Sequence, residues 1–595
     1  MSSLGNIINA IEAHGQFVDG QVRKARKDGK FAAELLERWR NILGQVPTVE
    51  TPAGLRLPRL ALPQTEEAGE VARFLFGEGM PGEFPFVNGA YPEMYLQTAP
   101  AKASRDSVKG SAQPPIEEPT RLFAGLGLVE DTNRRFHYLT RHQNSIRLST
   151  AFDGPTLYGI DSDGEGVSGK VGEGGVAVDT IDDMELLFAG FPLDHANFSV
   201  SMTINGPAPV ILAMYVAAAQ RRFGPGVVEK LRGTVQADIL KEVQAQNEII
   251  FPIGASLRFL TDMVEFATTH MPRWYPISIS GYHIAEAGAT PVQQAAFTLS
   301  NGFAYAEMFQ ARGMKVDQFA PRLSFFLDCG LDLEYLALGR VGRKLWAIGM
   351  RDVFDSGQRG QMFRLHTQTS GRSLIANHYK NNLTRTAIEL LMACANGTNS
   401  CHSNSADEPF TTPSEEYVQL AAHAQAIVLE ESGLFKLMMN TLAGSPGMKI
   451  VEYALEKAIL DEFRKIDQLG GVLAATELRY QRSQIQAAAH RYECQINDGV
   501  RPIIGWNRYG DRSASLPEVK VVRTPRSKQQ LQIARLKKFK KTHSSQCALA
   551  LDHLSKVVAG GGNVFAELLK TVEHCSLGQI TSSLQDQVGR FRPTV

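Results

Sequence analysis

The sequence predicts an α/β fold built on a parallel sheet, and its strands favour a sheet that closes into a barrel. Between about residues 120 and 440, segments with strand-like and helical periodicity alternate, an order typical of parallel strands joined by helices. Several strand-like segments also alternate large apolar residues with serine or threonine. Inward positions of an α/β barrel normally carry bulky branched side chains. Rows of small hydroxyls would instead leave the axis open and polar, wide enough for a long, thin substrate.

Two segments show this alternation most clearly. In NFSVSMTING, at 197–206, hydroxyl residues such as Ser201 alternate with apolar residues such as Met202. In YPISISGYH, at 275–283, Ser278 alternates with apolar neighbours in the same way. A period of two places each set on its own face of a strand. The strand candidates are 146–152, 197–204, 233–240, 276–282, 322–327, 363–369 and 399–404. Helices are expected between them, including 207–223, 257–270 and 291–312.

Helical patterns flank this region on both sides. Residues 1–64 are expected to form a helical arm that ends in an extended, proline-rich segment, and residues 446–595 a largely helical region. The barrel is assigned to 65–445. Within it, 96–119 is rich in Pro, Ala, Ser and Lys and shows no periodicity, so we expect a surface insertion or flexible loop there.

Composition and charge narrow the class of function. The 595 residues include 62 Lys and Arg and 62 Asp and Glu, so net charge gives no argument for nucleic acid or a membrane. No apolar run approaches the roughly 18 residues of a membrane span, and the N-terminus lacks the pattern of a secretory signal. Six scattered cysteines without CxxC spacing fit a reducing compartment better than a disulfide scaffold or zinc site. We therefore expect a cytoplasmic enzyme or a large binding protein.

One basic stretch, at 523–541, raises the question of nucleic acid again. It lacks the repeated aromatic residues of a nucleic-acid surface. We interpret it as the solvated face of a helix.

The segment GYHIAEAGAT, at 281–290, is a candidate catalytic segment. It follows a strand candidate, and the carboxyl end of a barrel strand is where catalytic residues lie. His283 could hydrogen-bond a substrate carbonyl, and Glu286 could contact a cofactor. An isolated histidine would more simply be a satisfied residue at a strand end, but the flanking strand and helix start favour a functional role.

Two further polar clusters accompany strand candidates. Gln236, Asp238 and Gln246 follow one strand, and glutamine, a poor proton-transfer group, is a good amide hydrogen-bond partner. Arg322 and Ser324, in APRLSFF, are candidates for a phosphate or amide contact, because an arginine fork matches phosphate well. A surface salt bridge of the arginine is an equally good interpretation.

Familiar catalytic motifs are absent from the sequence. It contains no GxGxxG after a strand, no GxxxxGK[ST], no HExxH and no nucleophile elbow. The glycine-rich segment at 164–175 is not a phosphate-binding loop, because Ser or Thr does not follow its lysine. Enzyme chemistry would therefore come from a borrowed cofactor.

A string of ordered motifs extends over about residues 65–510. They are AYPEMY (90–95), TRLFAG (120–125), STAFD (149–153), SVSMTINGP (199–207), GTVQADILKE (233–242), SISGYHIAEAGA (278–289), FAPRLSFF (319–326), QTSGRSL (368–374) and NNLTRTAIE (381–389). This string resembles the substrate-binding part of coenzyme B12-dependent acyl-CoA mutases, and most of all isobutyryl-CoA mutase. The resemblance implies a TIM (β/α)8 barrel threaded by the pantetheine arm of coenzyme A, an occupant that would explain the hydroxyl rows.

The resemblance also implies roles for individual residues. The family's chemistry begins with homolysis of the cobalt–carbon bond of adenosylcobalamin and proceeds by a 1,2 shift of the thioester carbonyl carbon. His283 would hydrogen-bond the thioester carbonyl. The positions that match contacts to the corrin or adenosyl group are Phe152, Tyr282, Glu286, Trp346 and Glu408. Those that match coenzyme A contacts are Tyr91, Met94, Arg121, Ser149, Ser201, Thr203, Thr234, Gln236, Arg322 and Ser324.

Two positions discriminate among mutases. Methylmalonyl-CoA mutases place Tyr and Arg where this chain has Phe123 and Gln246, and their arginine pairs with the free carboxylate of the substrate. A buried carboxylate without a cation is strongly disfavoured. The resemblance therefore implies an uncharged acyl group, with isobutyryl-CoA and n-butyryl-CoA interconverted, and adds Phe123 and Gln246 to His283 as catalytic residues. The alternatives are pivalyl-, 2-hydroxyisobutyryl- or methylmalonyl-CoA, or a non-catalytic regulatory subunit that binds coenzyme A.

The cobalamin-binding module of this family is not recognisable in the sequence. Its DxHxxG motif, which supplies the lower cobalt ligand, does not occur in the 595 residues, nor does the GTPase motif of the fused isobutyryl-CoA mutases. We therefore expect a large subunit that works with adenosylcobalamin held mainly by a separate small B12-binding subunit. A GTPase chaperone is a further candidate partner, and the family favours a dimer of large–small pairs.

Overall fold

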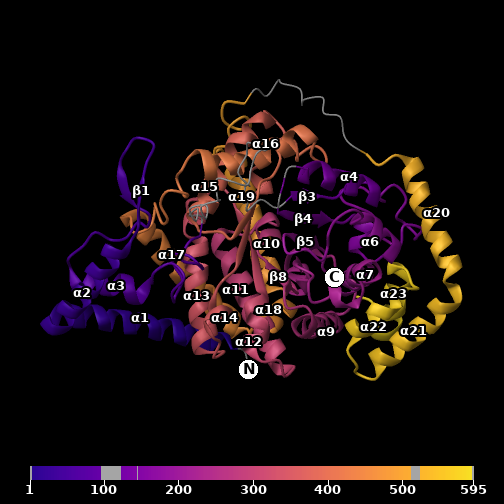
Figure 1. Cartoon of the computed structure of the whole chain (residues 1–595), viewed down its shortest axis with the longest axis horizontal. Helices are drawn as coiled ribbons and strands as arrows, with labels where there is room; N and C mark the ends of the chain where they lie inside the picture. Colours follow the sequence, from indigo (N-terminus) through magenta and orange to yellow (C-terminus); the bar gives the residue numbers. More distant parts are fainter. Residues whose placement is uncertain (1–2, 95–121, 142, 144, 511–522, 592–595) are drawn as a thin grey trace, which may run out of the picture.

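The computed structural model describes residues 3–94, 122–141, 143, 145–510 and 523–591. The predicted insertion at 96–119 therefore lies outside the described residues. Figure 1 shows a central region of strands and helices, with the N-terminal helices on one side and the last helices of the chain on the other.

The N-terminal region forms helices followed by a hairpin. Asp28 separates the first two helices, because its carboxylate accepts the backbone N–H groups of Lys30 and Phe31 and begins the second. Trp39 is 1% exposed and packs its ring on Phe74 in a small core of this region. The elements are α1 (Leu4–Lys27), α2 (Gly29–Gln45), β1 (Thr48–Glu50), β2 (Arg56–Pro58) and α3 (Ala68–Gly77).

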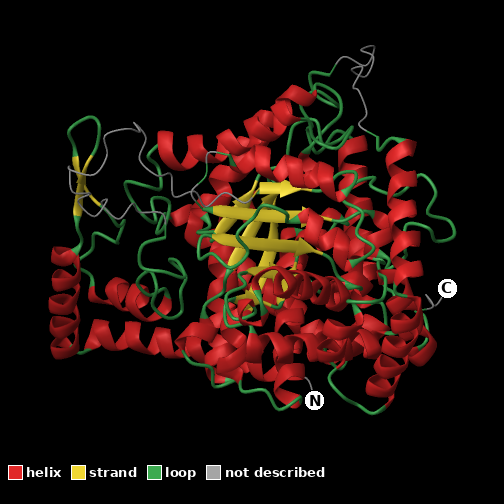
Figure 2. Ribbon diagram, turned by 45° about the vertical axis from the view of Figure 1, so that its right-hand side comes forward, coloured by secondary structure: helices red, strands yellow, loops and turns green. Residues whose placement is uncertain are grey.

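Parallel strands occupy the centre of the molecule, inside a layer of helices (Figure 2). In the described residues they form two sheets, in the orders β3-β4-β5-β6-β7 and β8-β9-β10-β11. Pro276 alone separates β7 from β8, and a proline cannot donate to a strand ladder. The strands are β3 (Leu122–Ala124), β4 (Ile146–Ala151), β5 (Phe198–Thr203), β6 (Gly233–Val235), β7 (Trp274–Tyr275), β8 (Ile277–Ser280), β9 (Leu323–Cys329), β10 (Leu365–Thr369) and β11 (Ser400–His402).

The predicted hydroxyl row is real and runs in register across neighbouring strands. Phe123 pairs with Ser149, Ser149 with Ser201, and Ser201 with Thr234, so these side chains share one face of the sheet. On β5, Ser199, Ser201 and Thr203 are half-buried, whereas the alternate residues Phe198, Val200 and Met202 are buried against the helical layer. The period-two interpretation of this segment is confirmed.

The strand predicted at 233–240 is too long. β6 ends at Val235, and Ala237 takes a left-handed φ of 50°. Asp238 then caps the short helix α8 (Ile239–Lys241) by accepting the Lys241 N–H. An Asx side chain offers the backbone this alternative to a strand ladder, and it turns the chain just past the end of the sheet.

Helices cover the outer face of the strands. α7 and α11 are buried almost all round, because they lie between the strands and a second layer of helices. The α-helices up to residue 426 that have not yet been named are α4 (Val129–Thr140), α5 (Gly154–Leu157), α6 (Ile181–Leu187), α7 (Ala208–Phe223), α9 (Ile253–His270), α10 (Tyr282–Glu286), α11 (Pro291–Ala311), α12 (Val316–Phe319), α13 (Leu338–Asp352), α14 (Gln358–Gln361), α15 (Asn382–Ala395) and α16 (Glu415–Ala426).

The C-terminal region is helical, as predicted. The basic stretch forms α20, and several of its cations pair with acidic residues of the central α/β region: Lys528 with Asp131, and Lys540 with Asp163. Its charge therefore serves in part to dock the helix. The elements are α17 (Pro446–Gln468), α18 (Val472–Glu477), α19 (Tyr480–Asn497), α20 (Arg526–Thr542), α21 (Ser544–Ala559), α22 (Val564–Thr571) and α23 (Leu577–Val588). Across the described ranges, no helix combines the length and apolar character that a membrane span requires.

Candidate functional site

The carboxyl end of β8 carries the predicted catalytic histidine. β8 ends at Ser280, and His283 lies in the first turn of α10. The Ser280 hydroxyl is 2.8 Å from His283 Nδ1. When that hydroxyl donates, the ring proton resides on Nε2, where it can be given to an acceptor. Burial, and then the positive charge of Lys241, hold the pKa of His283 well below its ordinary value, so the imidazole is neutral at pH 7.

The turn after α8 brings Gln246 to the same end of the sheet. This turn is a π-helical segment, Glu242–Gln246, a geometry that is frequent at functional sites. Helix α10 packs against the turn. Gln246 Oε1 accepts from Lys241 Nζ at 2.7 Å. Lys241 Nζ also lies 2.5 Å from Glu242 Oε1, with both side chains buried. The charges of this pair cancel beside His283.

Asp238 ties the Gln246 turn to the strand that carries His283. Its buried carboxylate accepts the Lys241 N–H at 3.2 Å, the Ser280 N–H at 2.7 Å and the Tyr305 hydroxyl at 2.7 Å. Burial raises the pKa of Asp238, and these hydrogen bonds oppose the rise. Asp238 thus has a positioning role between the two elements, and its side chain contacts Lys241, Ser280 and Tyr305.

The same turn is also held from outside the sheet. Gln244 exchanges hydrogen bonds with Asn301 of α11, each 2.9 Å long. Arg482 of α19 donates to the Val243 carbonyl at 2.6 Å. The turn is thus fixed on both sides, which leaves Gln246 little freedom.

Phe123 lies on β3 and contacts β11. Its ring centroid is 4.5 Å from that of His402. Burial lowers the pKa of His402 to about 4, so this second imidazole is also neutral at pH 7. Sequence reasoning did not single out His402, although its place in the alternating segment SCHSNSAD was a signal for an inward side chain.

Three predicted cofactor-facing residues gather at the carboxyl ends of the strands. Tyr282, Glu286 and Glu408 are close enough that the two carboxylates, after burial itself, raise the pKa of the Tyr282 hydroxyl. Glu286 Oε1 accepts the Gly371 N–H at 2.7 Å and the Ser370 hydroxyl at 3.3 Å. Burial raises the pKa of Glu408 to about 7. The Glu286 carboxylate is thus an acceptor held in place by neighbouring backbone N–H groups.

Two other predicted cofactor contacts have different surroundings. Trp346 is fully buried on α13, its indole N–H donates to the Gly360 carbonyl, and its ring packs on Phe303 and Phe325. The Trp346 ring therefore lies in the outer helical layer behind β9, and the structure does not bring it together with Glu286. Phe152 is 3% exposed and bridges to Val176 at the end of β4.

Three of the predicted coenzyme A contacts, Ser149, Ser201 and Thr234, lie in register on one face of the sheet. The buried Ser149 hydroxyl has no hydrogen-bond partner among the described residues, and Gln236 Oε1 accepts from Asn205 Nδ2 at 3.2 Å. In the loop after α3, Tyr91 is 40% exposed, and Met94 packs beside Gly89. Arg121 lies outside the described residues.

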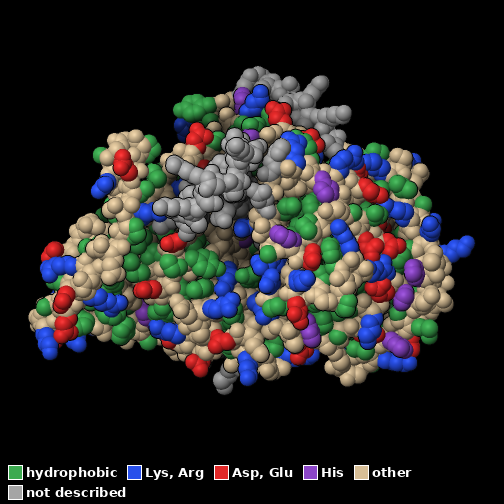
Figure 3. All heavy atoms as spheres, viewed as in Figure 1, with side chains coloured by type: hydrophobic (Ala, Val, Ile, Leu, Met, Phe, Trp, Pro, Cys, Tyr) green, Lys and Arg blue, Asp and Glu red, His purple; other side chains and the backbone are tan. Residues whose placement is uncertain are grey.

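Arg322 marks the opposite, amino-terminal end of the strands. It directly precedes β9, and its guanidinium donates to the carbonyls of Ala267 and Thr268 at 3.1 and 2.7 Å. Burial and the neighbouring Arg359 lower its pKa, so two cations lie close together there. Ser324 follows on β9 and donates to the Ile277 carbonyl at 3.1 Å. Figure 3 shows Lys and Arg side chains gathered near the middle of one face, below a hollow.

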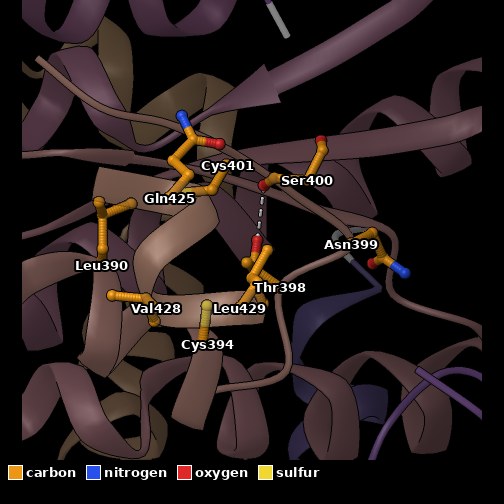
Figure 4. Close-up of a pocket in the computed structure, with 9 residues that line it drawn as sticks. All are labelled: Leu390, Cys394, Thr398, Asn399, Ser400, Cys401, Gln425, Val428 and Leu429. Carbon is orange, nitrogen blue, oxygen red and sulfur yellow. Dashed lines mark hydrogen bonds between the residues drawn. The ribbon is translucent and has the colours of Figure 1, made fainter. Parts of the chain in front are cut away.

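A small pocket lies apart from these residues. It lies beside β11 (Figure 4). Its volume is about 10 Å³, room for about one water molecule. Its lining consists of Leu390, Cys394, Thr398, Asn399, Ser400, Cys401, Gln425, Val428 and Leu429, and none of the predicted site residues is among them. In the described part of the chain, no group of three or more His, Cys, Asp and Glu side chains is arranged to hold a metal ion.

Comparisons with known proteins place the chain among acyl-CoA mutases. The family model described as methylmalonyl-CoA mutase matches residues 119–590. A fused isobutyryl-CoA mutase of Geobacillus kaustophilus is 42% identical over 571 residues, which cover 92% of this chain and 51% of the relative. This chain thus spans about half the length of the fused relatives.

Relatives with other names are also similar. The 2-hydroxyisobutanoyl-CoA mutase large subunit of Aquincola tertiaricarbonis is 36% identical, over 87% of this chain and 88% of the relative. The mitochondrial methylmalonyl-CoA mutase of Homo sapiens is 35% identical, over 87% of this chain and 66% of the relative.

Proposed function

This chain belongs to the methylmalonyl-CoA mutase family of B12-dependent acyl-CoA mutases, and on that premise we propose that it isomerises a short, uncharged, branched acyl-CoA. The reaction would interconvert isobutyryl-CoA and n-butyryl-CoA. The enzyme class is that of an isomerase that moves the thioester group between neighbouring carbons.

One observation carries the choice of acyl group: the charge balance around Gln246. Its carbonyl oxygen is held by Lys241, whose charge is matched by buried Glu242. Phe123 and His402 add an apolar ring and a neutral imidazole. A substrate carboxylate placed there would lose its water without gaining a cation, at a cost of several kcal/mol. A butyryl group would meet no such cost.

The proposal includes closure of the two sheets into one barrel. The Phe123–His402 ring contact brings the edges β3 and β11 together, and Pro276 alone interrupts the strand between β7 and β8. In a closed barrel the hydroxyl row Ser149–Ser201–Thr234 would line the axis and offer hydrogen bonds to a pantetheine arm. The same line leads towards Arg322, which suits a phosphate at the amino-terminal end.

His283 would act on the thioester. Its neutral ring keeps a proton on Nε2 when Nδ1 accepts from Ser280, and this N–H would donate to the thioester carbonyl oxygen. A donor aimed at an oxygen that gains charge typically contributes 10²–10³ in rate. Because the ring stays neutral, it orients the carbonyl and supports charge there without transferring its proton.

The acidic group fits the adenosyl part of adenosylcobalamin. Glu286 and Glu408 are hydrogen-bond acceptors near one another at the carboxyl ends of the strands, which suits the hydroxyl groups of a ribose. When bound, adenosylcobalamin would supply the radical that starts the rearrangement. We propose that a separate B12-binding subunit presents it, an arrangement supported by similarity along 88% of a relative named as a large subunit.

The decisive experiment is an isomerisation assay with a panel of acyl-CoA substrates. The chain, adenosylcobalamin and a B12-binding subunit would be mixed with isobutyryl-, n-butyryl-, pivalyl-, 2-hydroxyisobutyryl- and methylmalonyl-CoA. We expect the butyryl pair to react with the highest kcat/KM. Preference for methylmalonyl-CoA would contradict the proposed acyl group, and binding of every thioester without turnover would favour a regulatory subunit.

A further inference from the structure

Glu248 lies two residues beyond Gln246 and touches it directly. The Gln246 amide nitrogen donates to Glu248 Oε1 at 3.4 Å. The backbone N–H of Glu248 donates to Glu242 Oε2 at 2.9 Å, which fixes where its side chain starts. Asn247, between them, has a left-handed φ of 71°, so the chain reverses tightly and the two side chains come together.

These contacts set the orientation of the Gln246 amide. Its oxygen faces the Lys241 ammonium at 2.7 Å, and its nitrogen faces the Glu248 carboxylate. The reversed amide would point its N–H₂ at a cation and its oxygen at an anion. Lys241 and Glu248 therefore hold Gln246 from its two ends.

Glu248 also carries a charge that the turn does not match. The ionisable groups that face it are Lys241 and Glu242 of its own turn and Tyr158 at the end of α5. Lys241 is already paired with Glu242. An ionised Glu248 thus leaves a net negative charge beside the amide that is proposed to meet the acyl group.

We propose that Glu248 is a specificity-determining residue, whose carboxylate repels acyl groups that carry a carboxylate of their own. The inference rests on the proposed function and deepens it, because it gives the preference for an uncharged acyl group a second, repulsive cause. Discrimination is strongest when an unfavourable contact with the wrong ligand adds to a good fit for the right one.

The repulsion should depend on pH. Burial, followed by the charge of Glu242, raises the pKa of Glu248 to about 7. The carboxyl group is therefore mostly neutral at pH 6 and mostly ionised at pH 8. The extra carboxylate of methylmalonyl-CoA stays ionised across this range. Rejection of methylmalonyl-CoA should accordingly grow as pH rises from 6 to 8.

Calorimetric titration of the chain with isobutyryl-CoA and methylmalonyl-CoA at pH 6 and pH 8 tests this without the B12 subunit. We expect the Kd for methylmalonyl-CoA divided by the Kd for isobutyryl-CoA to rise on the order of tenfold from pH 6 to pH 8. Glu248→Gln keeps an oxygen that can accept from Gln246 but loses the charge, so its ratio should stay constant. Glu34→Gln, an exposed carboxylate of α2, is the matched control and should behave as the wild type.

The outcomes separate the two claims. If neither thioester binds the wild type, the proposed function is wrong. If both bind and the Glu248→Gln variant keeps the same pH dependence as the wild type, the role of Glu248 is wrong while the proposed function stands. Circular dichroism of each variant at both pH values confirms that the fold is intact.

Discussion

The two ends of the central strands differ in the charged groups that they carry. At the amino-terminal end, Arg322 and Arg359 lie close together. Peptide carbonyls hold the Arg322 guanidinium, which pairs with no carboxylate in the described part of the chain. At the carboxyl end, Lys241 is matched by Glu242, and the rings of His283 and His402 are neutral. One set of parallel strands thus presents positive charge at one end, and at the other end neutral imidazoles beside buried carboxyl groups.

This difference suits a long ligand with unlike ends. A phosphate group is recognised by a cationic fork, whereas a short aliphatic acyl group is recognised by shape and by the absence of unpaired charge. The hydroxyl row on β4, β5 and β6 runs between the two ends. Substitutions at either end should therefore affect different steps of the reaction.

Replacement of His283 should have the largest effect, because it removes the neutral donor of the carboxyl end. We expect His283→Asn to lower kcat for isobutyryl-CoA by about 10²–10³, with acyl-CoA binding changed by less than about threefold. The measurement is turnover with the B12 subunit, beside thioester titration. His553→Asn, an exposed histidine of α21, is the control. Equal losses in both variants would contradict the assignment.

Asp238 is the group that joins the two elements of the carboxyl end. Asp238→Ala would leave the N–H groups of Lys241 and Ser280 and the hydroxyl of Tyr305 without their acceptor. We expect the free energy of unfolding to fall by about 3 kcal/mol or more, measured by urea denaturation. A change below about 0.5 kcal/mol would show that the turn does not depend on this carboxylate.

The neutral imidazole of His402 should make stability depend on pH. Its pKa is about 4 in the folded protein and ordinarily about 6.5. Because the unfolded chain binds the proton more readily, the stabilising contribution is complete above pH 6.5 and is lost as pH falls towards 4. We expect His402→Gln to flatten this loss by roughly 2 kcal/mol, measured from unfolding curves between pH 4 and 7. An unchanged slope would contradict a buried neutral ring.

Arg322 tests the amino-terminal end, with a smaller effect. Arg322→Ala should weaken binding of isobutyryl-CoA about tenfold, because one charge-assisted contact to phosphate is lost. Binding of isobutyryl-pantetheine, which lacks the nucleotide, should stay the same. Arg23→Ala on α1 provides the control. Equal weakening for both thioesters would place Arg322 in a structural role.

Sequence reasoning found the repeating features of the fold and missed the irregular ones. The alternation in 197–206 predicted β5 and its faces, because a half-buried strand imposes a period of two. The same reasoning extended β6 to residue 240, because nothing in the local sequence distinguishes an apolar strand end from the turn that Asp238 caps. Sequence carry-over from the family assigned Trp346 to the cofactor, whereas its ring packs behind β9.

The site residues show the same division. His283 and Gln246 were predicted and come together through α10 and the π-helical turn. His402 was not singled out, because its role depends on a contact with Phe123 of a distant strand. Glu248 was not singled out either, because its contact with Gln246 depends on the left-handed backbone of Asn247 between them. A pairwise contact between distant strands leaves no periodic signal in one sequence.

A crystal structure of the chain with isobutyryl-CoA tests the central claim most directly. The account predicts a thioester oxygen within hydrogen-bond distance of His283 Nε2, a pantetheine arm along Ser149, Ser201 and Thr234, and phosphate groups at the Arg322 end. Electron density for the nucleotide beside His283 and the acyl group beside Arg322, or for coenzyme A on the outer helical layer, would contradict it.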